Sequence, residues 1–206
     1  LVWLPTHWTS VGEEDPFEKF VRKVREILVG VQLLEVKNYH LLTEEELRQK
    51  MNSTLRPIPL KNSTGDYNHL RNSLLPSVLK NLAENQHHES PQNLFEIGRT
   101  FTVDLTTETG ILEREKVAIL LCHETADYTE IRQLVDLLLR IVGLEYQVKE
   151  LRQPSFIPGR VGEVLVGNEK VGLLGEIHPE VLTRWNITTP VVSAELNLYK
   201  LFELIR

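Results

Sequence analysis

Apolar residues recur at helical spacing in three stretches of the chain. Asp15 and Pro16 suit the cap and the first turn of a helix, and residues 17–31 then place apolar side chains every third or fourth position. The same spacing follows Pro76 and returns between Asp127 and Gly143. The pattern predicts three amphipathic helices, and a further short helix is expected between Pro179 and Trp185.

Apolar runs and period-two alternation predict strands in much of the remaining sequence. The predicted strands cover residues 33–42, 95–103, 116–123, 144–148, 161–166, 171–177 and 191–198. Every residue from Val117 to Cys122 is apolar, which is typical of an interior strand with both faces covered. Gly167-Asn-Glu-Lys170 predicts a hairpin turn, and loops are expected at 56–66, 86–92 and 154–160.

The order of these elements favours an α+β fold, in which an antiparallel sheet is flanked by helices. Strands follow one another as hairpins rather than in strict alternation with helices. Residues 1–14 are expected to form an extended lead-in to a core domain that spans 15–206. That core could divide into sub-lobes 15–104 and 105–206, although no linker separates them.

Composition narrows the class of protein. The 206 residues carry 23 basic and 29 acidic side chains, so a net charge of −6 gives no cationic field that would attract nucleic acid. The single cysteine, Cys122, suits a reducing compartment. The chain contains no apolar run long enough to cross a bilayer and no signal-peptide pattern at its start, so the cytoplasm is the expected location.

Motifs that would carry catalysis are missing from the sequence. There is no glycine-rich phosphate loop and no Gly-x-Ser-x-Gly elbow. The neighbours Cys122 and His123 point to opposite faces of a strand, and His87-His88 lacks a third ligand, so no metal site is expected. Thr43-Glu-Glu-Glu46 is interpreted as a helix capping box rather than as an acidic metal cluster.

Two groups of residues resemble the β subunit of phenylalanyl-tRNA synthetase, in its archaeal-type branch. The first is Arg71-Asn-Ser-Leu-Leu-Pro76 followed by Phe95-Glu-Ile-Gly98. The second is Gly175-Glu-Ile-His-Pro-Glu-Val-Leu182, with Pro158-Gly-Arg160 before it and Ala194-Glu-Leu-Asn-Leu198 after it. Matches in the same order over nearly the whole chain are more specific than one short motif.

The resemblance implies a C-terminal, class II synthetase-like core domain that has lost its active site. Catalytic class II enzymes carry an arginine on the strand of their second motif and a glycine-rich segment ending in Glu-Arg in the third. The similar places here, 94–98 and 193–198, contain no arginine. We therefore expect no catalytic, cofactor-binding or metal-binding residues in this chain, which would be inactive alone.

The family further implies what the domain assembles with. The expected partners are the catalytic α subunit and a second αβ pair, in a heterotetramer that charges tRNA(Phe) with phenylalanine. ATP and magnesium would be used by the whole enzyme, and tRNA would touch this domain weakly if at all. Editing and magnesium-binding domains would precede Leu1, and no anticodon-binding domain would follow Arg206.

Five residues are candidates for the subunit interface: Phe17, Phe20 and Val24 on the first helix, which looks like the class II first motif, together with Arg71 and Arg160. Sequence alone does not divide the broad apolar helix face between the core and a partner. Arg71 could instead pair within the domain, and Arg160 could tie a loop to the sheet. Two alternative functions stay open, namely a retained ATP or amino-acid pocket and an independent protein-interaction module.

Overall fold

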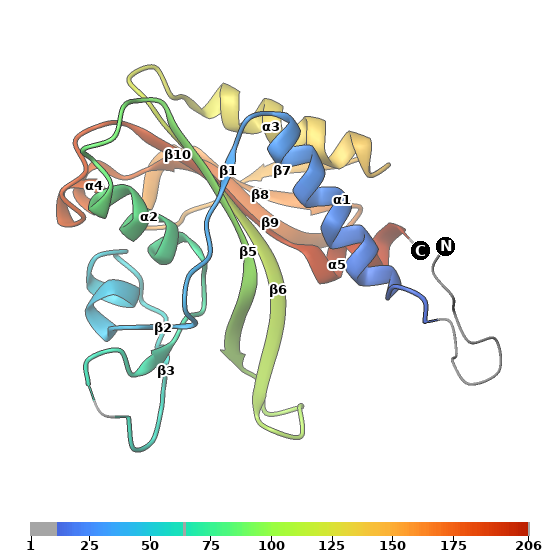
Figure 1. Ribbon diagram of the computed structural model, residues 1–206, viewed down its shortest axis with the longest axis horizontal. Helices are drawn as coiled ribbons and strands as arrows, with labels where there is room; N and C mark the ends of the chain where they lie inside the picture. Colours follow the sequence, from blue (N-terminus) through green and yellow to red (C-terminus); the bar gives the residue numbers. More distant parts are fainter. Residues whose placement is uncertain (1–11, 64, 206) are drawn as a thin grey trace, which may run out of the picture.

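A seven-stranded sheet runs through the centre of the molecule, and helices cover both of its faces (Figure 1). The computed structural model describes residues 12–63 and 65–205, so residues 1–11 of the expected lead-in lie outside it. The helices are α1 (Pro16–Gly30), the π-helical turn η1 (Glu45–Gln49), α2 (Leu75–Glu84), α3 (Tyr128–Ile141), α4 (Pro179–Arg184) and α5 (Leu198–Ile205). The strands are β1 (Leu34–Glu35), β2 (Leu41–Leu42), β3 (Ile58–Pro59), β4 (His69–Leu70), β5 (Gln92–Val103), β6 (Ile111–Cys122), β7 (Gln147–Glu150), β8 (Phe156–Val166), β9 (Glu169–Ile177) and β10 (Val191–Asn197).

The large sheet is mixed, which corrects the expectation of an antiparallel sheet in part. Its strand order is β1-β5-β6-β10-β9-β8-β7. Every neighbouring pair is antiparallel except the edge pair β1 and β5, which runs parallel. Strands from both sides of residue 104 share this sheet, because β5 and β6 pair from Gln92↔Cys122 to Val103↔Ile111. Whether the chain divides into sub-lobes stays a prediction.

Alternation along the central strands divides the apolar core into two. On β6, Val117, Ile119 and Leu121 belong to a core under α1, α3 and α5, whereas Ala118, Leu120 and Cys122 belong to a second core under α2 and α4. All six residues are buried. The expectation of an interior strand covered on both faces is therefore confirmed, and α+β describes the layers.

Helix starts follow the local chemistry of the sequence. Asp15 caps α1 by accepting the Phe17 backbone N–H at 2.8 Å. The expected capping box also forms, because Glu46 N–H donates to Thr43 Oγ1 at 3.1 Å and Thr43 N–H donates to Glu46 Oε2 at 3.0 Å. The turn that follows is π-helical rather than α-helical. Glu46 therefore takes the capping role that the sequence predicts.

The expected strand over residues 33–42 is wrong in its middle. Only its ends are strands, and they lie in different sheets: β1 pairs with β5, whereas β2 joins the small three-stranded sheet β2-β4-β3. The break falls at Asn38, whose backbone N–H and Nδ2 both donate to the Glu96 carboxylate.

The loop expected at 154–160 is also mostly strand, since β8 begins at Phe156. A register shift between Phe156 and Val161 accommodates Pro158 and Gly159, which has φ +78°.

We expect Leu120→Ala, in the middle of β6, to lower the free energy of unfolding by about 2–5 kcal/mol, because it leaves a cavity in a fully buried site. Chemical denaturation followed by circular dichroism measures the change. Leu105→Ala is the matched control, since Leu105 is 87% exposed and its loss should cost less than about 0.5 kcal/mol. Equal costs at the two positions would contradict the assignment of the second core.

Candidate functional site

The segment Arg71–Leu74 lies across one face of the large sheet and is held there by two buried carboxylates. Glu96 projects from β5 and Glu195 from β10, on the two sides of Ala118 of β6. These three residues form one row across the sheet, because Glu96 and Glu195 are both register partners of Ala118. We call the row and the segment above it the carboxylate face.

Glu96 is bound by a buried guanidinium. Arg71 Nη1 donates to Glu96 Oε1 at 2.8 Å, and both side chains have no solvent exposure. Arg71 also donates from Nε to the Arg99 carbonyl at 2.9 Å and from Nη1 to Ser77 Oγ at 3.3 Å. Asn38 completes the shell, because its Nδ2 donates to Glu96 Oε2 at 2.8 Å. A buried ion pair needs such extra hydrogen bonds to offset the desolvation of its charges.

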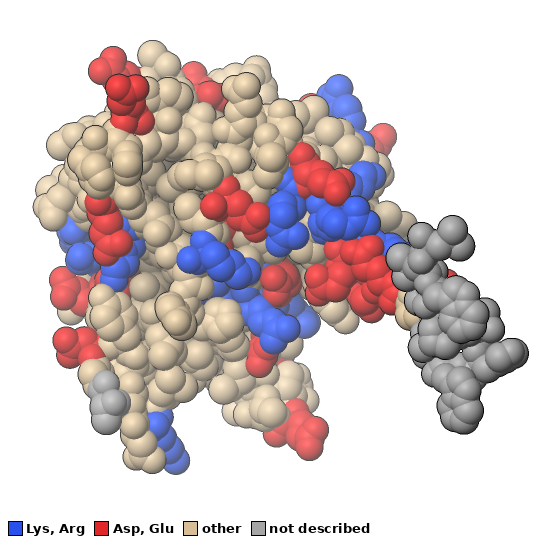
Figure 2. Space-filling view, viewed as in Figure 1, with Lys and Arg blue, Asp and Glu red and all other residues tan. Residues whose placement is uncertain are grey.

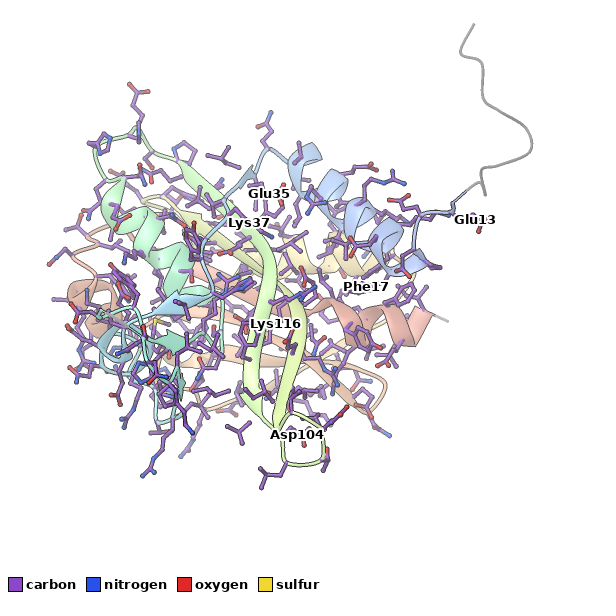
Figure 3. All side chains as sticks on the ribbon, turned by 60° about the horizontal axis from the view of Figure 1, so that its bottom comes forward. Glu13, Phe17, Glu35, Lys37, Asp104 and Lys116 are labelled. Carbon is purple, nitrogen blue, oxygen red and sulfur yellow. The ribbon has the colours of Figure 1, made fainter. Side chains whose placement is uncertain are left out.

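Glu195 binds the next residues of the same segment. Ser73 Oγ and the Leu74 backbone N–H both donate to Glu195 Oε2 at 2.7 Å. On the other oxygen, Lys116 Nζ donates to Oε1 at 2.7 Å, and Figure 3 shows Lys116 near the middle of the β5–β6 ribbon. Burial alone would raise the pKa of Glu195, but the Lys116 ammonium and the two further donors, Ser73 Oγ and Leu74 N–H, together outweigh it and lower the pKa. Glu195 is therefore an anion whose acceptors are occupied.

Gly98 provides the space for the guanidinium. A Cβ at this position would lie 2.4 Å from Arg71 Nη2, which is closer than side chains approach each other. The same Nη2 is buried without a hydrogen-bond partner among the described residues, as is Ser193 Oγ on β10. The fit at Gly98 explains why the expected strand carries glycine directly after Ile97.

The carboxylate face is filled by its own chain, and its buried charges are already paired. Within 12–63 and 65–205 there is no group of three or more His, Cys, Asp or Glu residues that could hold a metal ion. None of the described helices has the length and apolar character needed to cross a membrane. The hydrogen bonds to Glu96 and Glu195 attach residues 71–74 to the sheet.

The five predicted interface residues are not brought together. Phe20 and Val24 are buried in the core under α1, with 8% and 0% exposure. Phe17 is partly buried between α1 and α5 (Figure 3), where its ring contacts Tyr199 and Phe202 at centroid distances of 5.6 and 5.4 Å. Phe17 and Phe20 thus pack on α5 of the same chain. A contact of this stripe with a partner stays a prediction, and Phe17 is the most exposed of the three.

The two arginines differ in their surroundings. Arg71 pairs with Glu96 of the same chain, which is one of the two alternatives that the sequence left open. Arg160 is 61% exposed and donates to Glu176 Oε2 at 2.7 Å, while Glu176 Oε1 accepts the Tyr128 N–H at the start of α3. Arg160 thus ties β8 to β9 and leaves most of its side chain accessible.

A groove lies between β1, the end strand of the large sheet, and the end of α2, and it reaches the start of β5. It has a volume of about 600 Å³ and is lined by the apolar side chains of Val31, Leu34 and Val36, by Asn81 of α2 and by Asn85, which directly follows α2. Leu34 is 65% exposed, and the nearby Val29 at the end of α1 is 54% exposed. On the face shown in Figure 2, lysines and arginines are interspersed with acidic residues, so no large field of one sign covers it. We call Val29, Leu34 and this groove the β1 edge.

Comparison with known proteins identifies the domain. The family model described as the phenylalanyl tRNA synthetase beta chain CLM domain matches residues 2–198. The chain belongs to this family. Among archaeal relatives, the phenylalanine–tRNA ligase β subunits of Pyrococcus abyssi and Thermococcus gammatolerans are each 38% identical to it, over 194 and 202 residues and 93% of its length. The chain spans 35% and 36% of the length of those two relatives.

A solved structure bears out the fold of this CLM domain. Pyrrolysyl-tRNA synthetase from Desulfitobacterium hafniense superposes with a TM-score of 0.75, over 92% of this chain and 69% of its own, at 16% identity. The expected class II synthetase fold and the resemblance on which it rested are thus confirmed. Sequence reasoning assigned no role to Glu195 or Lys116, since nothing in the sequence indicates which residues lie opposite each other on β6 and β10.

Gly98→Ala should reduce the free energy of unfolding by about 1–3 kcal/mol, because the new methyl group displaces the Arg71 guanidinium from Glu96. Urea titration checks this. Gly30→Ala is the control, since a Cβ there meets nothing within 4 Å and alanine is favoured in a helix. If both variants were as stable as the unsubstituted chain, Gly98 would not be limiting the carboxylate face.

The pH dependence of stability should reveal Glu195. Its folded-state pKa lies below the ordinary value of 4.5, so its ionised contacts stabilise the fold above that pH and are lost as the pH falls below it. We expect the unfolding free energy to fall more steeply below about pH 4.5 in the unsubstituted chain than in Glu195→Gln. Denaturation series at stepped pH compare the slopes, and parallel curves would contradict the assignment.

Proposed function

We propose that this chain is a non-catalytic class II-like domain of a phenylalanine–tRNA ligase β subunit and that it holds the catalytic α subunit. The names of its archaeal relatives and the match to the CLM family model support this assignment. In this proposal the whole enzyme, a cytoplasmic heterotetramer of two α and two β chains, uses ATP and magnesium to charge tRNA(Phe). This domain binds none of these small molecules.

The chemistry of the carboxylate face supports the absence of catalysis. Class II catalysis needs cations at the nucleotide, because guanidinium groups bind phosphate and carboxylate oxygens with two bonds at once. The strands that resemble the second and third motifs here project Glu96 and Glu195 instead. Each carboxylate already has its own internal cation, Arg71 and Lys116. A triphosphate at this face would meet two buried carboxylates, and residues 71–74 already fill the space that it would need.

The β1 edge is the feature that most supports binding of an α subunit. Strand β1 ends the sheet, so its outer side offers backbone groups to another chain beside exposed Leu34 and Val29. An open strand edge next to an apolar groove is a site of protein association. The other apolar side of α1 is covered by α5, through the contacts of Phe17 and Phe20 with Phe202. Docking of the α subunit at the β1 edge is therefore consistent with what the chain leaves uncovered.

The test is co-expression of the chain with a catalytic α subunit, followed by measurement of the complex mass and its Kd. We expect a complex, and we expect Leu34→Glu to weaken it at least about tenfold, because a charge would replace an apolar contact. Leu105→Glu, on the 87% exposed Leu105 of the β5–β6 turn, is the control that adds the same charge away from the β1 edge. Recovery of two separate species with the unsubstituted chain would refute the proposal.

A parallel titration separates this function from a retained small-molecule site. Calorimetry of the chain with ATP, phenylalanine and phenylalanyl-adenylate should give no saturable binding. Saturable binding of any of the three would favour the alternative that a ligand pocket persists.

A further inference from the structure

A second pocket, of about 330 Å³, opens between α2 and the segment that carries β2. Its rim includes Tyr39, which is 91% exposed, and Tyr67, which is 52% exposed. Leu41 and Leu42 contribute apolar surface, and Lys80 and Glu84 of α2 contribute charge. Aromatic side chains exposed to this extent, next to a concave surface, are typical anchors of protein interfaces. We call this site the tyrosine pocket.

The tyrosine pocket has an unbalanced negative charge, because the lysine that lines it, Lys80, is already paired with Glu46. Lys80 Nζ donates to Glu46 Oε1 at 2.7 Å and to Tyr67 Oη at 2.9 Å, and it also lies 4.5 Å from the centre of the Tyr67 ring. By contrast, Glu84 makes no hydrogen bond or ion pair with any part of the chain that the structure describes. One unpaired carboxylate thus lines the same pocket as the highly exposed ring of Tyr39.

A free carboxylate beside an exposed aromatic ring matches the guanidinium group. The planar cation can stack on the tyrosine face while its N–H groups donate to the carboxylate. A nucleic acid would bring phosphates to Glu84 in a chain of net charge −6, which disfavours it. We propose that the tyrosine pocket receives an arginine side chain of the catalytic α subunit, stacked on Tyr39 and paired with Glu84.

The position of the pocket points to this partner, and the inference rests on the function proposed above. The tyrosine pocket and the groove of the β1 edge both open beside α2: Lys80 and Glu84 line the former, Asn81 and Asn85 the latter. The hydrogen bond from Asn38 Nδ2 to Asn81 Oδ1, 2.8 Å long, joins a residue that lines the pocket to one that lines the groove. A protein seated on the β1 edge is therefore close to the tyrosine pocket. The two together extend the interface toward the size that stable complexes need.

The experiment measures the Kd of the α subunit complex at low and high salt for Tyr39→Ala and Glu84→Gln. Each should weaken binding at least about tenfold, and Glu84→Gln should also flatten the salt dependence. Leu105→Ala and Glu108→Gln are matched controls at the exposed β5–β6 turn and should bind like the unsubstituted chain. Alanine replacement of each α-subunit arginine, combined with Glu84→Gln, should identify one arginine whose effect is not additive.

The outcomes separate this inference from the proposed function. Binding that is weakened by Leu34→Glu but unchanged by Tyr39→Ala and Glu84→Gln would overturn the tyrosine pocket and leave the assembly proposal in place. Absence of any complex with the unsubstituted chain would overturn both. Retained α subunit affinity, together with tRNA binding that Tyr39→Ala abolishes, would also overturn the inference. Melting curves of both variants should match the unsubstituted chain, since both side chains are exposed.

Discussion

The buried pair of Arg71 and Glu96 determines how the two sheets are joined. A three-stranded sheet of two-residue strands has little stability of its own, so it must be attached to a larger core. Arg71 follows β4 directly, and its side chain crosses to β5. Its backbone also links the sheets, because its N–H donates to the His40 carbonyl at 3.0 Å and its carbonyl accepts the Phe101 N–H at 2.9 Å. Removal of one charge would leave the other buried and unpaired, which is far more costly than never burying the pair.

The same interaction constrains what the sheet can do chemically. Strands β5 and β10 place Glu96 and Glu195 on one face, separated by the small Ala118, so the chain can lie close between them. The fold is that of a tRNA synthetase, yet this face is occupied by residues 71–74 and stabilised by internal cations. A fold does not fix an activity, and the polar groups on its face decide what binds. The proposed loss of catalysis thus needs no change in topology, only acidic residues where anions would bind.

Local chemistry predicted most elements, and long-range contacts account for the failures. The Asp15 cap, the Thr43–Glu46 box and the two-faced strand 117–122 were visible because their partners lie within a few residues or their pattern is internal. Residues 33–42 read as one strand because the contact that breaks it, from Asn38 to Glu96, joins positions 58 residues apart. Likewise, helix spacing identified the apolar stripe of α1, but only the fold shows that α5 covers part of it.

The division of apolar surface between core and partner follows from this packing. Helix α1 has one buried stripe, and α5 covers its aromatic end, so the helix leaves Val29 and the adjoining β1 as exposed apolar surface. Strand β1 can stay an edge because it is only two residues long and its continuation is turned away at Asn38 toward Glu96. That turn also carries Tyr39 outward, to 91% exposure. The hydrogen bonds of one buried carboxylate therefore both stop the strand and present the tyrosine, which is why the open edge and the aromatic pocket lie side by side.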